Sequence, residues 1–203
     1  MKINNSSNSK YKKTTQHIYA IEKYFDTHSQ YWDIVYKSED IAKGFVSYEM
    51  RERKKYIINL LNSYIQNSYG NILDCGCGGG GIIIDLIEHG YNVVGIDISY
   101  HQLLKAKDNI HNSQLASKST KSGTACLIQA NSEQLPFQDN TFDVILCVGV
   151  LQYLPDDRQL IKEISRVIKP EGLVVITLPN IMKINNIFDP LLLFSSRNTI
   201  CVV

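Results

Sequence analysis

The stretch "NILDCGCGGGG", residues Asn71 to Gly81, decides the fold of this chain. It opens as a short apolar run and then contains only cysteine and glycine from position 75 to position 81. Glycine loses more backbone freedom on folding than any other residue, so a glycine run is costly to order. The run therefore indicates a place where some other group approaches the main chain too closely for larger side chains.

The sequence around this stretch alternates between strand-like and helix-like patterns. Most of the strand-like runs are continuously apolar, which is typical of strands buried on both faces of a parallel sheet. Strand, helix and strand in repetition predict an α/β fold, a three-layer, doubly wound, mostly parallel sheet of the Rossmann-like kind. The predicted strands cover residues 71–75, 92–97, 125–130, 142–148 and 173–178, and the predicted helices cover 48–66, 82–89, 99–110 and 156–168.

Short local signals set the expected ends of these elements. Gly90 is placed to end the first core helix, and Ser99 is placed to cap the second. Residues 111–123 read as a polar loop, and Lys169–Gly172 reads as the end of the last helix. The glycine run lies between the first strand and the first core helix. In open parallel sheets, ligands bind at such a point.

Length and composition predict one domain with extensions. The chain has 203 residues, which suits a single domain better than two. We interpret residues 1–15 as a disordered leader and residues 16–68 as an N-terminal helical cap or lid. Residues 69–180 form the predicted ligand-binding core, and residues 181–203 form a short divergent or truncated C-terminal segment.

Charge and cysteine usage narrow the class of protein. The formal net charge of +1 gives no support for nucleic-acid binding, and no apolar run reaches the roughly 18 residues of a membrane span. The polar N-terminus lacks the apolar core of a signal peptide, so we expect a cytoplasmic protein. The five cysteines read as small buried thiols. Cys75 and Cys77 lie too close together for a typical zinc site, and no metal is expected.

Two ligand classes fit the glycine run. Gly76, Gly78 and Gly81 match the dinucleotide pattern G-x-G-x-x-G. Asp74 together with Gly76, Gly78 and Gly80 matches D-x-G-x-G-x-G. A carboxylate near the loop repels a pyrophosphate and attracts a cation. It therefore favours S-adenosyl-L-methionine, which carries an ammonium and a sulfonium group, over a dinucleotide.

Four segments in order then resemble the class I, seven-stranded S-adenosylmethionine-dependent methyltransferases, and in particular the small-molecule type that includes the ubiquinone and menaquinone methylases. These segments are "ILDCGCGGG", "VVGIDIS", "QANSEQLPFQDNTFDVILCVGVLQYLPD" and "LIKEISRVIKPEGLVVITLPN". The resemblance covers about residues 70–180. It implies an enzyme that moves a methyl group by in-line displacement to an O, N or C atom of a small-molecule acceptor.

The resemblance also implies roles for individual residues. The loop backbone would hold the methionine part of the cofactor, and Asp97 would accept the ribose hydroxyls. Ile98 would pack on adenine, while Asn131 stands where the family commonly has Asp for the adenine amino group. Cys147 and Val148 would lie beside the sulfonium. The full set of candidate cofactor-binding residues is Asp74, Gly76, Cys77, Gly78, Gly80, Asp97, Ile98, Asn131, Ser132, Cys147 and Trp32.

The acceptor side is less defined by the sequence. Candidate residues are Gln152 and Tyr153, which follow the fourth strand, and His28, which lies in the aromatic segment around Trp32. That segment is the candidate lid, since aromatic faces attract cations. Relatives often have His near position 152, and Gln cannot replace it as a base. No catalytic base is therefore assigned.

The C-terminus departs from the family pattern, and two other function classes stay open. The family sheet normally ends in an antiparallel hairpin, for which residues 181–203 are short, so we expect this hairpin to be short or missing. An NAD(P)-binding oxidoreductase or epimerase would use the same loop, but this class gives no reason for the acid at Asp74. A non-catalytic protein on the same scaffold is the third class, and a damaged loop would mark it.

Overall fold

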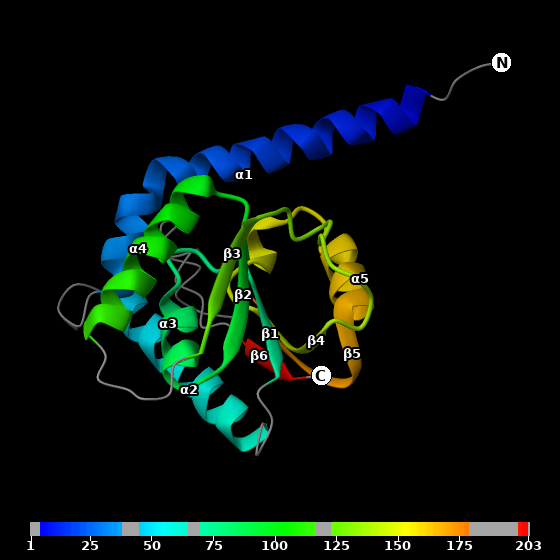
Figure 1. The fold of residues 1–203 in the computed structure, drawn as a ribbon. Helices are drawn as coiled ribbons and strands as arrows, with labels where there is room; N and C mark the ends of the chain where they lie inside the picture. Colours follow the sequence, from blue (N-terminus) through cyan, green and yellow to red (C-terminus); the bar gives the residue numbers. More distant parts are fainter. Residues whose placement is uncertain (1–4, 38–44, 65–69, 117–122, 179–198, 203) are drawn as a thin grey trace.

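The computed structural model describes residues 5–37, 45–64, 70–116, 123–178 and 199–202 (Figure 1). Two helices precede the sheet, α1 (Asn5–Lys37) and α2 (Phe45–Tyr64). The remaining elements are β1 (Asn71–Cys75), α3 (Gly81–Glu88), β2 (Asn92–Asp97), α4 (Tyr100–Ala116), β3 (Ala125–Gln129), β4 (Phe142–Cys147), the 3-10 helix η2 (Leu151–Tyr153), α5 (Arg158–Val167), β5 (Ile168–Leu178) and β6 (Thr199–Val202).

The strands form one sheet in the order β3-β2-β1-β4-β5-β6. The first five strands are parallel, and β6 runs antiparallel to β5. The order reverses between β1 and β4, so the loops that follow these two strands diverge and leave a crevice between them. The predicted doubly wound α/β fold is confirmed.

Helices cover both faces of the sheet. Figure 1 shows α2, α3 and α4 on one face and α5 on the other, with α1 crossing the edge where the strands end. One core cluster joins Ile57 and Leu61 of α2 to Ile83 of α3, and the second joins Phe142 to Leu160 of α5. Each fully buried side chain of this size contributes about 1.5–3 kcal/mol. Burial on both faces is the reason that the strands read as continuous apolar runs.

Three element boundaries differ from the sequence prediction. Helix α1 includes residues 5–15, which were predicted to be a disordered leader. Adding one residue to an existing helix is cheaper than starting a helix, so this polar segment extends a helix formed further along. Helix α4 continues to Ala116 instead of stopping near position 110, since neither glycine nor proline interrupts residues 100–116. The predicted loop at 111–123 is therefore wrong for its first six positions.

The third difference lies at the start of β5. This strand begins at Ile168, directly after α5, and includes the Lys169–Gly172 stretch that was predicted to end the helix. The pairing of β4 with β5 is irregular between Phe142 and Val144, and Glu171 has a φ of 64°. A strand can include residues that resemble a turn in the sequence when its pairing is locally irregular.

The C-terminal region contributes one described strand. β6 pairs antiparallel with β5, with Val202 opposite Val175 and Thr199 opposite Leu178. The apolar stretch "TICV" near the C-terminus is this strand. The other apolar stretch, "PLLLF", lies outside the described residues. Within the described parts of the chain, no helix has the length and apolar character needed to cross a membrane.

Candidate ligand site at the carboxyl edge of the sheet

A large pocket opens where the strand order reverses. The empty space between its walls is about 1170 Å³, a figure that includes open solvent at the mouth. The structure brings many of the predicted site residues together in its wall. These are Trp32, Gly76, Gly78, Asp97, Ile98, Asn131, Ser132, Gln152 and Tyr153.

The glycine loop forms the floor of this pocket. Gly76 and Gly78 have φ angles of 73° and 51°, a region that favours glycine. A Cβ atom on Gly76 would lie 2.4 Å from Cγ2 of Val150. The amides of Gly76 and Cys77 both donate to the carbonyl oxygen of Ile96, at 2.8 and 2.9 Å. The loop is therefore fixed to the end of β2, with bare backbone facing the pocket.

Gly80 and Cys77 support the loop from outside the pocket wall. Gly80 precedes α3 with a φ of 78°, and a Cβ there would lie 3.1 Å from the Cβ of Ala106 on α4. Glycine is needed at position 80 because the start of α3 lies close to α4 there. The thiol of Cys77 points into the core beside Gly95. Both residues were candidate cofactor contacts, and neither is among the residues that line the pocket.

Asp97 presents its carboxylate at the centre of the site. Its Oδ1 accepts a hydrogen bond from the Ser99 amide and its Oδ2 accepts one from the Gly78 amide, each at 2.9 Å. The side chain lines the pocket and is 9% exposed. Burial raises the pKa of Asp97 to about 6, although the hydrogen bonds from backbone amides oppose that shift. Each carboxylate oxygen keeps a further lone pair for a ligand.

Asp74 lies beneath the same site, in β1 opposite Gly95 of β2. It is 2% exposed and lies outside the pocket wall. Burial, together with the negative charge of Asp97, raises the pKa of Asp74 to about 7. Two neighbouring buried carboxyls give this end of the pocket an excess of negative charge. A cationic ligand would favour the ionised form of both groups.

Asn131 and Ser132 form another part of the wall, after β3. Oδ1 of Asn131 accepts a hydrogen bond from the Glu133 amide at 2.9 Å, and the Asn131 carbonyl accepts one from Gln134 at 3.0 Å. These bonds shape a turn and fix the side chain. The Asn131 NH2 group and one further lone pair on Oδ1 are left for a ligand.

The segment after Asn131 is held in place by an ion pair on α5. Arg166 Nη1 donates to the Phe137 carbonyl at 2.7 Å, and its Nη2 donates to the Leu135 carbonyl at 3.0 Å. Glu163 pairs with Arg166 and accepts a hydrogen bond from the Leu135 amide at 2.8 Å. The hydrogen bond from Arg166 lowers the pKa of Glu163. This pair therefore keeps the segment after Asn131 attached to α5.

Helices α1 and α2 supply an apolar wall that the sequence only partly predicted. Trp32 lines the pocket as expected, and Ile18, Ile21, Phe25 and Met50 join it. The α1 members recur at intervals of three, four and seven residues, which places them on one helical face. That spacing is the signal by which the wall could have been found. Further unpredicted members of the wall are Arg53, Gln102, Glu133 and Gly149.

The acceptor-side candidates separate into two groups. Gln152 and Tyr153 line the pocket, and the Tyr153 ring meets Phe25 edge-on with centroids 4.8 Å apart. The Tyr153 carbonyl also lies 2.9 Å from Nε2 of His17. Burial raises the pKa of Tyr153 above its usual range.

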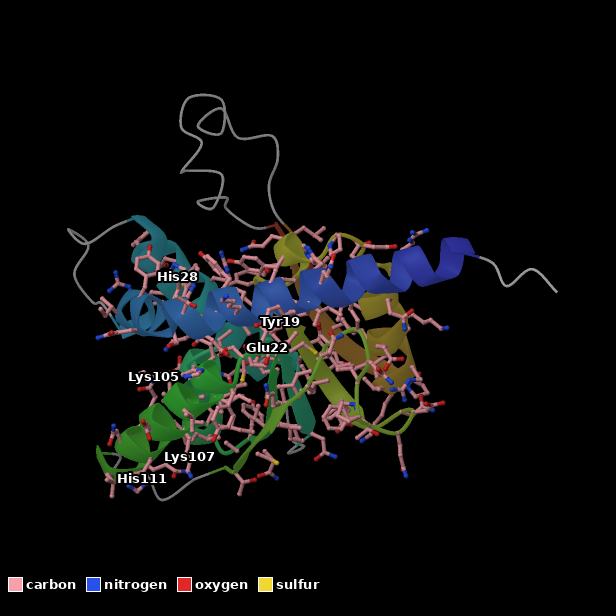
Figure 2. All side chains as sticks on the ribbon, turned by 90° about the horizontal axis from the view of Figure 1, so that it is seen from above. Tyr19, Glu22, His28, Lys105, Lys107 and His111 are labelled. Atoms are coloured by element: carbon pink, nitrogen blue, oxygen red, sulfur yellow. The ribbon has the colours of Figure 1, made fainter. Side chains whose placement is uncertain are left out.

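His28 lies elsewhere. Its ring stacks on Tyr24 at 4.4 Å and its Nδ1 lies 2.8 Å from the Tyr24 carbonyl, on an exposed part of α1 labelled in Figure 2. It does not line the pocket. Cys147 is also outside the wall. It is fully buried opposite Cys75 and Ile176, and burial raises its pKa to about 12. Side chains alternate along the chain at a strand end. Val148 accordingly faces the pocket where Cys147 does not.

Comparison with known proteins gives this geometry a family context. The sequence model of the family described as "Methyltransferase domain" matches residues 73–176. The chain is 29% identical over 143 residues to the ubiquinone biosynthesis O-methyltransferase of Aliivibrio fischeri, covering 67% of this chain and 58% of that protein. It is 30% identical over 104 residues to the sterol 4-C-methyltransferase strm-1 of Caenorhabditis elegans, covering 51% of this chain and 29% of that protein. The chain thus spans about half or less of the curated relatives' length.

Solved structures show the same fold. The magnesium protoporphyrin IX methyltransferase of Synechocystis PCC 6803, with bound SAH, superposes with a TM-score of 0.68 at 18% identity, over 90% of this chain and 82% of that one. The PH0226 protein of Pyrococcus horikoshii OT3 superposes with a TM-score of 0.55 at 29% identity, over 64% of this chain and 58% of that one. Among the described residues, no cluster of His, Cys, Asp or Glu could hold a metal ion.

Proposed function

Because the chain belongs to the family of methyltransferase domains, we propose that its pocket binds S-adenosylmethionine and that the protein transfers the methyl group to an apolar small molecule. One observation carries the proposal. A single pocket joins the bare glycine loop and Asp97 at one end to an apolar, aromatic wall from α1 and α2 at the other. The first end suits a nucleoside cofactor and the second suits an apolar acceptor.

The residues present fit this cofactor. Asp97 has lone pairs for ribose hydroxyls, and Gly76 and Gly78 let the methionine part lie against backbone. The NH2 group of Asn131 is placed for a ring nitrogen of adenine, and Ser132 offers its amide. The two buried carboxyls, Asp74 and Asp97, complement the positive charges of the ammonium and sulfonium groups. A pyrophosphate in the same place would meet repulsion.

Residues 16–68 are proposed to form the lid over this site. Ile18, Ile21, Phe25 and Trp32 of α1 line the pocket, and the Phe25 ring meets the Tyr153 ring. Aromatic side chains near a sulfonium contribute cation–π attraction. A closed lid also excludes water from the reacting atoms.

Methyl transfer from this cofactor requires little chemistry from the protein side chains. The cofactor supplies a methyl group activated by a positively charged sulfur, which an acceptor atom displaces in line. The protein's part is to align the acceptor, and alignment of this kind is worth about 7–11 kcal/mol in favourable cases. Gln152 and Tyr153 are proposed to position the acceptor. An acceptor that arrives ionised needs no base. An acceptor that keeps its proton would have to transfer it to water or to Glu133, which lines the pocket.

The acceptor class follows from the wall and from the relatives. Two of the relatives are named as a sterol 4-C-methyltransferase and a ubiquinone biosynthesis O-methyltransferase. The apolar wall formed by Phe25, Trp32 and Met50 suits a ring or hydrocarbon. We also propose a cytoplasmic location, in keeping with the free thiols of Cys75, Cys77, Cys126 and Cys147.

A thermal-shift experiment tests the proposal. The melting temperature of the protein is measured with S-adenosylmethionine, S-adenosylhomocysteine and NAD in parallel, since a ligand that binds only the folded state stabilises it. Stabilisation by the first two and not by NAD is expected, and Asp97→Ala should abolish it. Stabilisation by NAD alone would replace the proposal with an oxidoreductase. No shift with any of the three would favour a non-catalytic protein.

A further inference from the structure

Gln102 is an unusual residue to find buried in the wall of this pocket. It lies in the first turn of α4, lines the pocket and is 2% exposed. Its side-chain Oε1 is buried, and no described group donates a hydrogen bond to it. A buried amide oxygen without a donor lowers stability, and an apolar side chain of the same shape would avoid that cost. A polar residue here therefore needs a partner that is absent from the polypeptide.

The surroundings of Gln102 show which part of the pocket wall its side chain belongs to. Its backbone amide donates to Oγ of Ser99 at 3.1 Å, so the residue lies one turn after the cap of α4. Side chains of a helix lean toward the helix N-terminus. For Gln102 that direction leads to the turn carrying Asp97 and Ile98, and all three residues line the same pocket.

The hydrogen-bonding inventory at this turn favours a hydroxyl donor. Each oxygen of the Asp97 carboxylate already accepts one backbone amide. The side-chain oxygen of Gln102 can only accept. The ribose of the proposed cofactor carries two adjacent hydroxyl groups, and each of them must donate a proton when it is buried.

We propose that Oε1 of Gln102 accepts a hydrogen bond from a ribose hydroxyl of the cofactor, so that Gln102 and Asp97 share the ribose diol. Gln102 is thus a binding and specificity residue that selects nucleosides carrying both hydroxyls. This inference rests on the proposed function, because the ligand is the proposed cofactor.

The test compares Gln102→Met with the wild-type protein. Methionine keeps the length of the side chain and removes the acceptor. The affinity for S-adenosylhomocysteine, measured by isothermal titration calorimetry, should fall about 3- to 10-fold, the loss of one hydrogen bond. The melting temperature of the ligand-free variant should stay the same or rise. The matched control is Gln114→Met, on an exposed position of the same helix, which should change neither quantity.

Analogues of the ligand assign the bond. With 2′-deoxy or 3′-deoxy S-adenosylhomocysteine, the penalty of the variant should vanish for the one analogue that lacks the bonded hydroxyl. With S-inosylhomocysteine, which lacks the adenine amino group, the penalty should remain. A penalty that vanishes only with the inosine compound overturns the proposal and assigns Gln102 to adenine.

Three other outcomes also overturn it. Equal affinity of variant and wild type shows that Gln102 makes no bond to the ligand. A penalty that persists with every analogue and comes with a lower melting temperature shows a structural role. Failure of the wild-type protein itself to bind S-adenosylhomocysteine removes the proposed function as well, and this result is distinct from the other two.

Discussion

At the scale of single residues, two buried carboxyls carry most of the argument about the ligand. Asp74 and Asp97 are almost completely buried, and burial raises the pKa of both. No chain would place two such groups together for stability, because each ionised carboxyl makes the other more costly. A cationic ligand gives the arrangement a use, since it stabilises the charges that the protein alone disfavours.

This arrangement predicts how stability depends on pH. The carboxyl of Asp74 has a pKa of about 7 in the folded protein, against 3.8 as its ordinary value. The folded state therefore binds more protons between pH 4 and 7, and the free energy of unfolding of the ligand-free protein falls as pH rises through this window. The upper bound is about 4 kcal/mol at roughly 1.36 kcal/mol per pKa unit.

Chemical denaturation at pH 5, 6, 7 and 8 measures this effect. Asp74→Asn should flatten the dependence and should be more stable than wild type at pH 8. The control is Asp108→Asn, an exposed position on α4, which should keep the wild-type slope. Identical slopes for Asp74→Asn and wild type would show that Asp74 is ionised over the whole range from pH 5 to 8. Another interaction would then offset the cost of burying its charge.

A second prediction at this scale concerns Gly76. Alanine at this position would place its Cβ 2.4 Å from Val150 and would adopt a φ of 73°. Gly149 has the same φ of 73° but open space around its Cβ, with Arg53 Nη1 at 3.9 Å. Gly149→Ala should cost about 1 kcal/mol for backbone strain, and Gly76→Ala should cost about 2–4 kcal/mol because the clash adds to it.

Urea denaturation gives both free energies of unfolding. Both glycines have the same φ, so the cost of backbone strain is the same in the two variants. The difference between their free energies of unfolding therefore measures the clash with Val150. Equal losses for the two variants would mean that Val150 moves aside, and that the loop has more room than the structure shows.

At the scale of elements, α1 is fastened to both rims of the pocket that it covers. Asp26 accepts hydrogen bonds from Oγ of Ser99 and from the His101 amide, and it pairs with the His101 ring at 3.1 Å. Glu22, labelled in Figure 2, accepts from the Gln129 side chain at 3.3 Å. On the opposite rim, His17 bonds the Tyr153 carbonyl. A ligand of this pocket must therefore pass a helix that is held by polar contacts.

Asp26 is the contact most open to test. Burial would raise the pKa of Asp26, but the hydrogen bonds from Ser99 and His101 outweigh it and lower the pKa. Asp26→Asn removes the charge and weakens these bonds by about 1 kcal/mol. Amides of residues 16–32 should then exchange with solvent about five-fold faster in hydrogen–deuterium exchange. Amides of β1 and β4 should keep their protection.

Asp108→Asn serves as the control for the loss of one negative charge. S-adenosylhomocysteine should also dissociate faster from Asp26→Asn than from this control, because the lid opens more often. If exchange in α1 is unchanged while the melting temperature of the whole protein falls, then Asp26 supports the core and α1 is not a separately opening element.

At the scale of the whole molecule, β6 closes an edge that the parallel sheet would leave open. Val202 to Thr199 pair antiparallel with Val175 to Leu178 of β5. Unpaired strand edges are templates for association with other chains. Removing residues 199–203 should therefore increase self-association, as measured by light scattering during size-exclusion chromatography. The control is removal of Val203 alone. A truncated chain that stays monodisperse at the same concentration would show that the β5 edge is protected in another way.

The sequence predicted the nucleoside end of the site much better than the acceptor end. Gly76, Gly78 and Asp97 were found because a sharp turn and a strand-end acid leave a local mark in the sequence. Cys147 and His28 were candidate site residues, and they do not line the pocket. Their positions depend on which face of a strand end or helix turns inward, and neighbouring elements decide that. The sequence predicted a lid over residues 16–68 but did not single out Ile18 and Ile21, because a helical stripe shows an apolar face without showing what the face covers.

By itself, the sequence determined the order of strands and helices and the bare loop with its acid, because each of these is encoded by periodicity and backbone demands within a few residues. Only the tertiary structure decided that α1 crosses the carboxyl edge, that Gln102 and Asp97 face one cavity, and that Asp74 lies buried beneath it. These contacts join residues far apart in the chain. They are fixed by packing of the three layers, a property that no local stretch of sequence contains.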